Sequence, residues 1–197
     1  MPPTAVDSRA RCWWPNGVLG ADPLMVAYHD EEWGVPVSDE RDLFERLALE
    51  SFQAGLSWAT ILRKRRAFRL AFADFEPAVV AAFGEADRER LLADAGIVRN
   101  RAKIDATIGN AALLLALAAE RGSFAAYLAT ALPRPAPTLP QGSGRQDVPA
   151  TTPESDWLSA DLRKRGFRFI GSTIAYSFMQ SVGLVDDHLP GCFRYAG

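Results

Sequence analysis

The chain has 197 residues, 48% of them hydrophobic, and a formal net charge of -2. It is long enough to bury a core and short enough for one domain, and its two cysteines cannot form a disulfide framework. No apolar run approaches the ~20 residues that cross a bilayer, and the opening does not resemble a signal peptide. These features favour a cytoplasmic protein with no membrane partner.

The positively charged residues gather in three clusters, although the chain as a whole is acidic. The clusters are Arg63, Lys64, Arg65, Arg66 and Arg69; Arg99, Arg101 and Lys103; and Arg163, Lys164, Arg165 and Arg168. Solvated helix faces account for any one of them. Three together shift the expectation modestly towards a surface that meets phosphates.

Helical signals begin in "DPLMVAYHDEEWG", where Asp22 suits an N-cap and a proline follows at the first helical position. A longer helix, capped by Ser38 or Asp39, should break near Gly55. Another helix should follow in "WATILRKRRAFRLAFADF" and continue until Pro77. The first quarter of the chain and the segment after it are therefore predicted to be helical.

The middle of the chain predicts two helices that flank the turn "DAGIV", which contains Gly96, in a helix-hairpin-helix shape. The stretch from Pro133 to Pro153 is rich in proline, glycine and polar residues and predicts an exposed loop without regular structure. Two more helices, in "ESDWLSADLRKRG" and "STIAYSFMQSVG", should be separated by a short extended piece, "FRFI". Since no series of alternating strands is visible, the predicted fold class is all-α.

One carboxylate falls on the apolar stripe of the helix that begins near Asp39. Steps of 100° per residue bring Glu50 into line with Leu43, Leu47 and Ala54. A buried carboxylate is costly unless it is paired, hydrogen-bonded or used in function. Glu50 is therefore either a functional residue or a buried glutamate satisfied by an arginine or a backbone amide.

Aromatic residues surround Glu50 in the sequence, and four of the five tryptophans lie in the first third of the chain. They are Trp13, Trp14, Tyr28 and Trp33 before Glu50, and Trp58 after it. Aromatics at helical spacing are more often core residues than a binding site. A carboxylate among indoles is, however, also what a pocket for a flat cationic heterocycle needs, because the rings stack and the carboxylate accepts hydrogen bonds.

The chain contains only two cysteines and two histidines, Cys12, His29, His188 and Cys192. Two thiolates and two imidazoles are a common closed tetrahedral zinc site, and these ligands disfavour magnesium and calcium. The spacing is not that of a standard zinc finger, so two unrelated thiols and two unrelated histidines remain the alternative. A zinc ion with four protein ligands would be structural and would tie the first helix to the last segment.

Several long blocks of the sequence resemble the bacterial 3-methyladenine DNA glycosylase I family across nearly the full length of the chain. They are "CWW", "DPLMVAYHDEEWGVP", "LALESFQAGLSWATIL", "LLADAGIVRNRAKI" and "RKRGFRFIGSTIAYSFMQSVGLVDDHLPGC". The resemblance implies an all-α helix-hairpin-helix enzyme that removes 3-methyladenine from double-stranded alkylated DNA without cutting the strand. It also implies one structural zinc ion per chain, and we expect a monomer.

The resemblance assigns roles to individual residues. The zinc ligands are Cys12, His29, His188 and Cys192; Glu50 is the catalytic, base-binding glutamate; Trp14, with the adjacent Trp13 as the alternative, Met25, Tyr28, Trp33 and Trp58 belong to the base pocket; Gly55 and Leu56 wedge into the duplex; Gly96, Ile97 and Val98 bind the DNA backbone. The expected organisation is a single domain over 1–197. Residues 38–155 form its hairpin-containing part, and residues 11–37 with 156–197 form the zinc-clasped part.

The chain departs from the family pattern near the pocket. Met25 stands where a tyrosine usually follows "DPL", and Ser51 and Phe52 replace a more typical glycine and glutamine. These differences leave two alternatives to a 3-methyladenine glycosylase: a catalytically silent DNA-binding relative, or a glycosylase retuned to another alkylated base.

Overall fold

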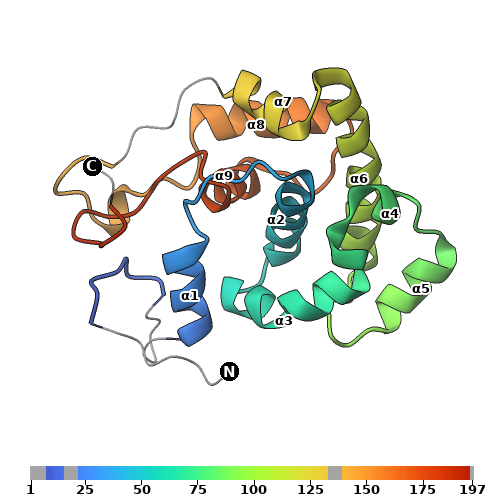
Figure 1. Cartoon of the computed structure of the whole chain (residues 1–197), viewed down its shortest axis with the longest axis horizontal. Coiled ribbons are helices and arrows are strands. Elements are labelled where there is room, and N and C mark those ends of the chain that lie inside the picture. Colours follow the sequence, from blue (N-terminus) through green and yellow to red (C-terminus); the bar gives the residue numbers. More distant parts are fainter. Residues whose placement is uncertain (1–7, 16–21, 133–138, 196–197) are drawn as a thin grey trace.

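The computed structural model describes residues 8–15, 22–132 and 139–195, and within these ranges every regular element is a helix (Figure 1). The predicted all-α class is confirmed for this part of the chain. The α-helices are α1 (Pro23–Glu31), α2 (Glu40–Gln53), α3 (Trp58–Ala71), α4 (Pro77–Ala81), α5 (Glu85–Ala93), α6 (Arg101–Arg121), α7 (Phe124–Ala131), α8 (Pro153–Lys164) and α9 (Ser172–Ser181), with 3-10 turns η1 (Ala73–Phe75) and η2 (Arg145–Asp147).

Side-chain caps begin the first two helices where the sequence predicts them. Asp22 accepts a hydrogen bond from the amide of Leu24 at 3.1 Å, and Asp39 accepts one from the amide of Asp42 at 3.0 Å. Shortly after the end of α2, Gly55 adopts a φ of +83°, which residues with a side chain rarely adopt. The predicted break near Gly55 is therefore confirmed.

Helix α3 is shorter than predicted. It ends at Ala71, and Pro77 begins the separate helix α4 instead of ending α3. Between them, the residues of η1 have φ values from 51° to 58°, so the chain makes a left-handed turn. Phe75 in this turn is fully buried and stacks on Phe72, with ring centroids 5.5 Å apart. Burial of the two rings outweighs the helical preference of the segment.

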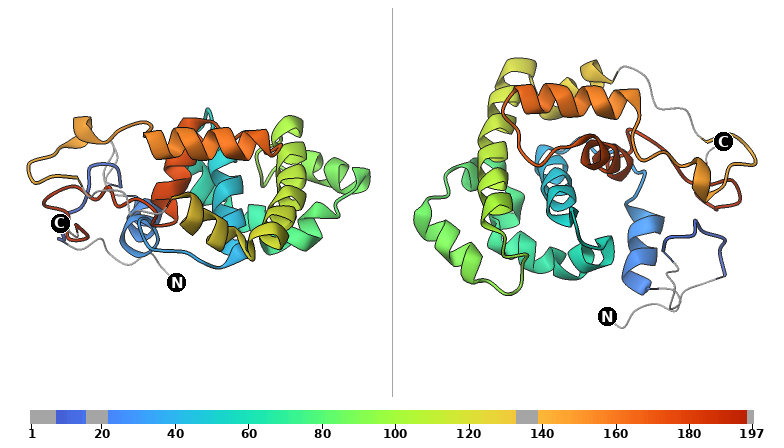
Figure 2. Two further views of the ribbon diagram at one scale, coloured as in Figure 1. Left: turned by 90° about the horizontal axis from the view of Figure 1, so that it is seen from above. Right: turned by 180° about the vertical axis from the view of Figure 1, so that it is seen from behind.

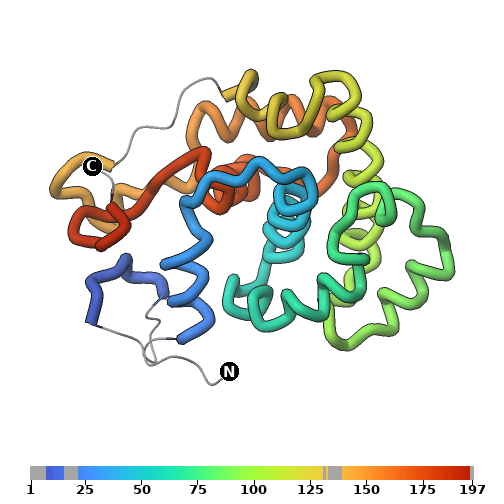
Figure 3. Tube along the Cα trace, viewed as in Figure 1, coloured from blue at the N-terminus to red at the C-terminus, as the bar shows by residue number. Residues whose placement is uncertain are grey.

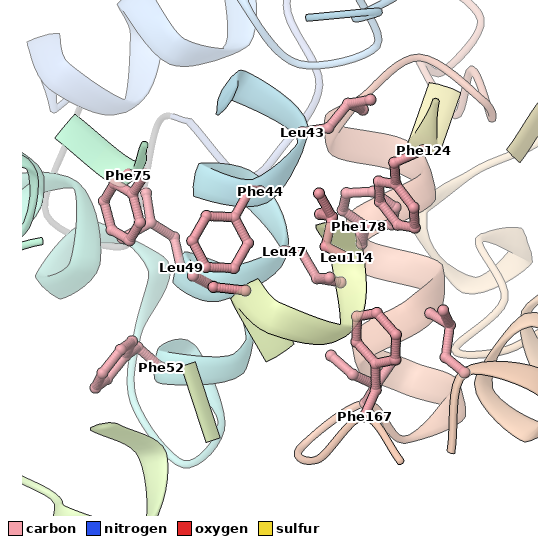
Figure 4. Packing of buried hydrophobic residues seen from close by; sticks show 14 of the residues in the cluster. Leu43, Phe44, Leu47, Leu49, Phe52, Phe75, Leu114, Phe124, Phe167 and Phe178 are labelled. Carbon is pink, nitrogen blue, oxygen red and sulfur yellow. The ribbon is translucent and has the colours of Figure 1, made fainter. Parts of the chain in front are cut away.

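The hydrophobic core lies around α2, which packs against α3, α6, α7 and α9. Figure 4 shows two faces of α2 in use, with Phe44 near Phe75 and Leu47 near Leu114 of α6. Helix α6 is long and apolar enough to cross a membrane by length and composition alone. It packs against α2, α4, α5 and α7, and this packing accounts for its apolar side chains.

The two predicted helices around Gly96 are α5 and α6, which pack against each other on either side of the turn. The predicted loop between 133 and 153 is only partly described, since 133–138 lie outside the described residues. Its described part is not free of structure, because it contains η2, and Leu139 is only 9% exposed. The piece "FRFI" between α8 and α9 is not extended as predicted, because Phe169 has a φ of +59°.

The two ends of the described chain lie side by side (Figure 3). The amide of Phe193 donates a hydrogen bond to the carbonyl of Ala10 at 2.9 Å. The division into 38–155 and 11–37 with 156–197 stays a prediction. One core cluster includes residues from both parts, so the core does not separate them.

Candidate functional site

A cavity of about 330 Å³ lies between α1, α2, α3 and α9, and its size suits a small flat ligand. Its walls include every residue that the sequence assigned to a base pocket. These are Trp14, Met25, Tyr28, Trp33, Glu50 and Trp58, and they are joined by Trp13, Gln53, Val148, Pro149, Ala150, Thr173, Tyr176, Ser177 and Gln180. Residues 148–150 belong to the segment that was predicted to be an exposed loop, so this segment contributes to the pocket.

The aromatic side chains form a connected wall. Trp14 meets Trp33 edge-on at 5.2 Å between ring centroids, and Tyr28 lies 5.2 Å from Trp58. Trp14 also lies 6.1 Å from Tyr28 and so links the two pairs. Trp13 is 38% exposed and lies near Arg145 instead. Of the two adjacent tryptophans, Trp14 is therefore the one that packs within the wall, and its edge contacts hold the rings in place.

Glu50 lines this pocket from α2 and is only 5% exposed. Its side chain has no hydrogen-bond partner among the residues that the structure describes. Burial raises the pKa of Glu50 to about 8, against the attraction of Arg46 one turn earlier. Arg46 does not pair with it and donates instead to the carbonyl of Ser181 at 2.5 Å. The carboxyl group is thus protonated at neutral pH and lacks the arginine or backbone partner of the structural alternative.

Two further polar groups of the pocket can donate hydrogen bonds to a ligand. The Nε1 atom of Trp58 is buried, and it has no partner in the described part of the chain. Burial raises the pKa of Tyr28 far above its ordinary value, so its hydroxyl stays protonated. A buried donor without a partner is unfavourable by about 1–3 kcal/mol, a cost that a ligand acceptor removes.

Helix α9 supplies a polar wall that the sequence analysis missed. Thr173, Tyr176, Ser177 and Gln180 line the pocket at the three- and four-residue spacing of one helix face. Tyr176 and Gln180 donate hydrogen bonds to the buried carboxylate of Asp187 at 2.5 and 2.6 Å. Asp187 therefore fixes two of these side chains. The missed signal was this polar stripe in an otherwise apolar helix.

The four cysteine and histidine side chains come together near the two ends of the described chain. The ligand atoms of Cys12, His29 and Cys192 all lie within 4.8 Å of one another, and all three residues are buried. The ring of His188 lies 5.0 Å from that of His29, and its Nε2 is buried without a partner in the described ranges. The structure thus brings together the four residues that the sequence singled out as possible metal ligands.

Carboxylates orient both imidazoles of this cluster. Nδ1 of His29 lies 2.8 Å from Asp30, and Nδ1 of His188 lies 2.7 Å from Asp186. Imidazoles that bind metals in proteins are commonly held in this way. Nε2 of His29 lies 3.5 Å from Sγ of Cys192. Burial raises the pKa of Cys12 to about 12, so its thiol stays protonated unless a cation binds it.

The turn between α2 and α3 projects an apolar side chain from a fixed base. Leu56 is 40% exposed, and a side chain added at Gly55 would meet no atom within 4 Å. Beneath the turn, Nζ of Lys103 donates to the carbonyls of Phe52 and Ala54 at 3.0 and 2.6 Å. The end of α2 is thereby held by α6.

The turn between α5 and α6 is partly used internally. The amide of Gly96 donates to the side chain of Asp94 at 2.7 Å, and Lys64 donates to the carbonyls of Ala95 and Gly96. The side chain of Ile97 is buried and anchors the turn in the core. Of the three residues assigned to the DNA backbone, Gly96 and Ile97 thus also shape the turn, while Val98 follows it.

The clustered cations divide into structural and surface groups. Arg65 and Arg69 bind the buried carboxylate of Glu45, and Lys103 caps α2. The side chains of other cluster members remain exposed and have no ion-pair or hydrogen-bond partner in the part of the chain that the structure describes. They are Arg66, Arg99, Arg163, Lys164 and Arg168.

An all-α fold with an aromatic pocket around an unpaired carboxyl group defines a protein that binds a flat, electron-poor heterocycle such as a nucleobase. Residues 18–195 match the methyladenine glycosylase family model, and the chain belongs to that family. It is 48% identical to DNA-3-methyladenine glycosylase 1 of Escherichia coli (strain K12) over 187 residues, which are 95% of this chain and 97% of that protein.

Two solved structures share the fold. A crystal structure of 3-methyladenine DNA glycosylase I has a TM-score of 0.86 at 48% identity and covers 94% of this chain and 99% of its own. A variant of 3-methyladenine DNA glycosylase I in complex with 3-methyladenine has a TM-score of 0.84 at 38% identity, with coverages of 89% and 94%.

Proposed function

We propose that this protein is a DNA repair glycosylase that excises 3-methyladenine from alkylated DNA by hydrolysing the N-glycosidic bond, without cutting the strand. The observation that carries the proposal is Glu50, buried in an aromatic pocket without a partner. Membership of the methyladenine glycosylase family supports it, as do relatives named for this activity.

The chemistry of the pocket favours a cationic base over ordinary adenine. Methylation at N3 gives adenine a positive charge, to which indole rings are attracted through their faces. A cation beside Glu50 lowers the pKa of the carboxyl group, so the bound lesion stabilises the carboxylate, which then accepts hydrogen bonds from the ring edge. Neutral adenine offers no such charge and meets a protonated acid instead.

Cleavage of the glycosidic bond then needs little help from a general base. The bond is already weakened, because departure of the base restores a neutral ring. The sequence directly after Gly96 contains no glycine-proline-rich turn followed by an aspartate that could assist cleavage. Asp105 on the following helix pairs with Arg88 at 2.9 Å and does not line the pocket. A positioned water completes the hydrolysis.

The pocket is closed to a base inside a duplex, so the substrate nucleotide must rotate out of double-stranded DNA. In the proposed complex, Leu56 fills the gap that the nucleotide leaves, and the helix-hairpin-helix turn at Gly96 to Val98 meets the backbone. The unpaired surface cations neutralise phosphates. We propose that one chain suffices for this, acting as a monomer.

We also propose that Cys12, His29, His188 and Cys192 bind one structural zinc ion per chain. Two thiols and two imidazoles favour zinc over magnesium or calcium. The buried Nε2 of His188 has no partner in the described ranges, and a metal ion bound there would supply one. With four protein ligands the ion leaves no position for water. It would hold α1 against the C-terminal segment and supply no chemistry to the reaction.

Incubation of methylated duplex DNA with the protein, followed by identification of the released bases, tests the proposal. Release of 3-methyladenine is the expected result. Release of nothing, with DNA binding retained, would favour a silent binding relative. Release of a different base would favour a retuned glycosylase. Met25 in the pocket wall would then be the first residue to substitute.

A further inference from the structure

We propose that Phe169 is a second DNA-contacting side chain, which stacks on a base beside the flipped nucleotide while Leu56 fills the gap. The inference rests on the proposed function, because it requires a duplex bound over the mouth of the pocket. Leu56 and Phe169 are large apolar side chains that are both 40% exposed. Each is carried by a tight turn rather than by a helix face.

Phe169 lies beside the end of α2 and beside the pocket. Ser51, in the last turn of α2, donates a hydrogen bond to the carbonyl of Phe169 at 3.2 Å. Thr173, four residues after Phe169, lines the pocket together with Gln53 of α2. Figure 2 shows from two further sides that α9, which follows Phe169, lies next to α2. The turn that carries Phe169 is therefore attached to the same end of α2 as the turn that carries Leu56.

The backbone at Phe169 is held in a conformation that a bulky residue rarely adopts, with a φ of +59°. Asn110 bonds both the amide and the carbonyl of Arg168, at 2.9 and 3.0 Å, and Ser159 donates to the carbonyl of Ile170 at 2.7 Å. Both of these polar side chains are at most 4% exposed. Such over-determined strain is typical of functional segments, and here its effect is to hold an aromatic ring in solvent.

Unpaired cations flank the ring. Phe169 shares a surface hollow with Arg163 and Arg168, whose side chains are exposed and have no partner within the described ranges. An aromatic ring that shares a hollow with two arginines suits a base and its neighbouring phosphates, because every base stacks and every phosphate attracts arginine. The chemistry of this hollow therefore fits nucleic acid better than an apolar protein partner.

Two substitutions at Phe169 distinguish the effect of the aromatic ring from that of the turn conformation. Phe169→Asn removes the ring, and asparagine tolerates the left-handed conformation, so the turn is kept. Phe169→Tyr keeps a stacking face. Leu115→Gln is the matched control, since Leu115 is 38% exposed on α6, about 18 Å along the helix from Lys103. The probes are a duplex with one tetrahydrofuran abasic-site analogue and free 3-methyladenine.

We expect Phe169→Asn to weaken binding of the duplex about 5- to 100-fold, the range measured when one base loses an aromatic partner. Phe169→Tyr and Leu115→Gln should stay within about two-fold of the unsubstituted protein. Affinity for free 3-methyladenine should not change in any variant, because the ring lies outside the pocket walls.

The outcomes distinguish this inference from the proposed function. If the unsubstituted protein binds neither probe, the proposed function fails. If it binds both and Phe169→Asn binds the duplex equally well, only the contact by Phe169 is overturned. A parallel loss of affinity for free 3-methyladenine would show that the ring merely supports the pocket, and this result would also overturn the inference.

Discussion

The pocket and the cysteine–histidine cluster lie back to back and differ in how they treat buried polar groups. The ring centroids of Trp14 and His29 lie 5.1 Å apart, and those of Trp33 and His188 lie 4.7 Å apart, so the two regions share a wall. In the cluster, carboxylates fix the Nδ1 atom of each imidazole. In the pocket, Glu50 has no partner in the described chain. The cluster is built to hold one arrangement, whereas the pocket is completed only by a ligand.

Loss of the proposed metal ion should have the largest effect. If the cluster held no ion, it would not be a fixed site, and its contrast with the pocket would fail. We expect about one zinc per chain in protein purified without chelators. Cys192→Ser should lower the unfolding free energy by at least about 3 kcal/mol, or Tm by about 6 to 12 °C, because the clasp between the chain ends is lost.

A chelator provides the control for this prediction. It should destabilise the unsubstituted protein and have little further effect on the Cys192→Ser variant. Elemental analysis that finds less than about half a zinc per chain would contradict the metal site and leave four unrelated side chains.

Substitution of the pocket carboxylate should come next. Glu50→Gln should lower excision of 3-methyladenine about 100-fold, roughly 2.7 kcal/mol. The reason is that an amide cannot ionise and so cannot balance the positive charge of the methylated base. Binding to duplex DNA should remain within a few-fold. Glu76→Gln is the control, since Glu76 is exposed and lies outside the pocket. Unchanged excision in Glu50→Gln would mean that Glu50 does not recognise the base.

Protonation of Glu50 should also make the free energy of unfolding depend on pH. Its pKa is raised to about 8, so the folded state keeps the proton that the unfolded state loses near its ordinary pKa. Stability from this group is therefore fully present below the ordinary pKa of a glutamate, falls as the pH rises above it, and is lost by about pH 8.

Urea unfolding measures this contribution. The unfolding free energy of the unsubstituted protein should fall by about 2 kcal/mol more between pH 6 and 8.5 than that of Glu50→Gln, which has no proton to lose. Parallel pH profiles for the two proteins would place the titration elsewhere.

The smallest effect is expected at the pocket wall. Met25→Tyr adds an aromatic ring to the pocket wall, and should change affinity for free 3-methyladenine by about 2- to 10-fold, the usual size of one aromatic contact. Leu24→Tyr is the matched control, because Leu24 is the adjacent residue, 40% exposed and outside the pocket. Equal effects of both substitutions would show that Met25 does not shape the site.

Local signals predicted the parts of the fold that local chemistry decides. The caps at Asp22 and Asp39 and the break at Gly55 follow from side chains and glycine conformation within a few residues. The end of α3 and the bend at Phe169 could not be predicted in this way. They are set by burial of Phe75 and by hydrogen bonds from residues more than fifty positions away in the chain.

The same division holds for the site. Glu50 was visible because it breaks an apolar stripe, and the cysteines and histidines were visible because no others exist. The polar wall of α9 was not found, since threonine, serine and glutamine are ordinary on any helix. Two side chains of this wall, Tyr176 and Gln180, are held by Asp187, which lies in the chain after α9.

The wall shared by Trp14 and Trp33 has a practical consequence. Both indoles face the pocket, and both rest on imidazoles of the cluster. Anything that displaces His29 or His188 must therefore also move an indole. The intrinsic fluorescence of Trp14 and Trp33 should therefore change both when a base enters the pocket and when the cysteine–histidine cluster is disturbed.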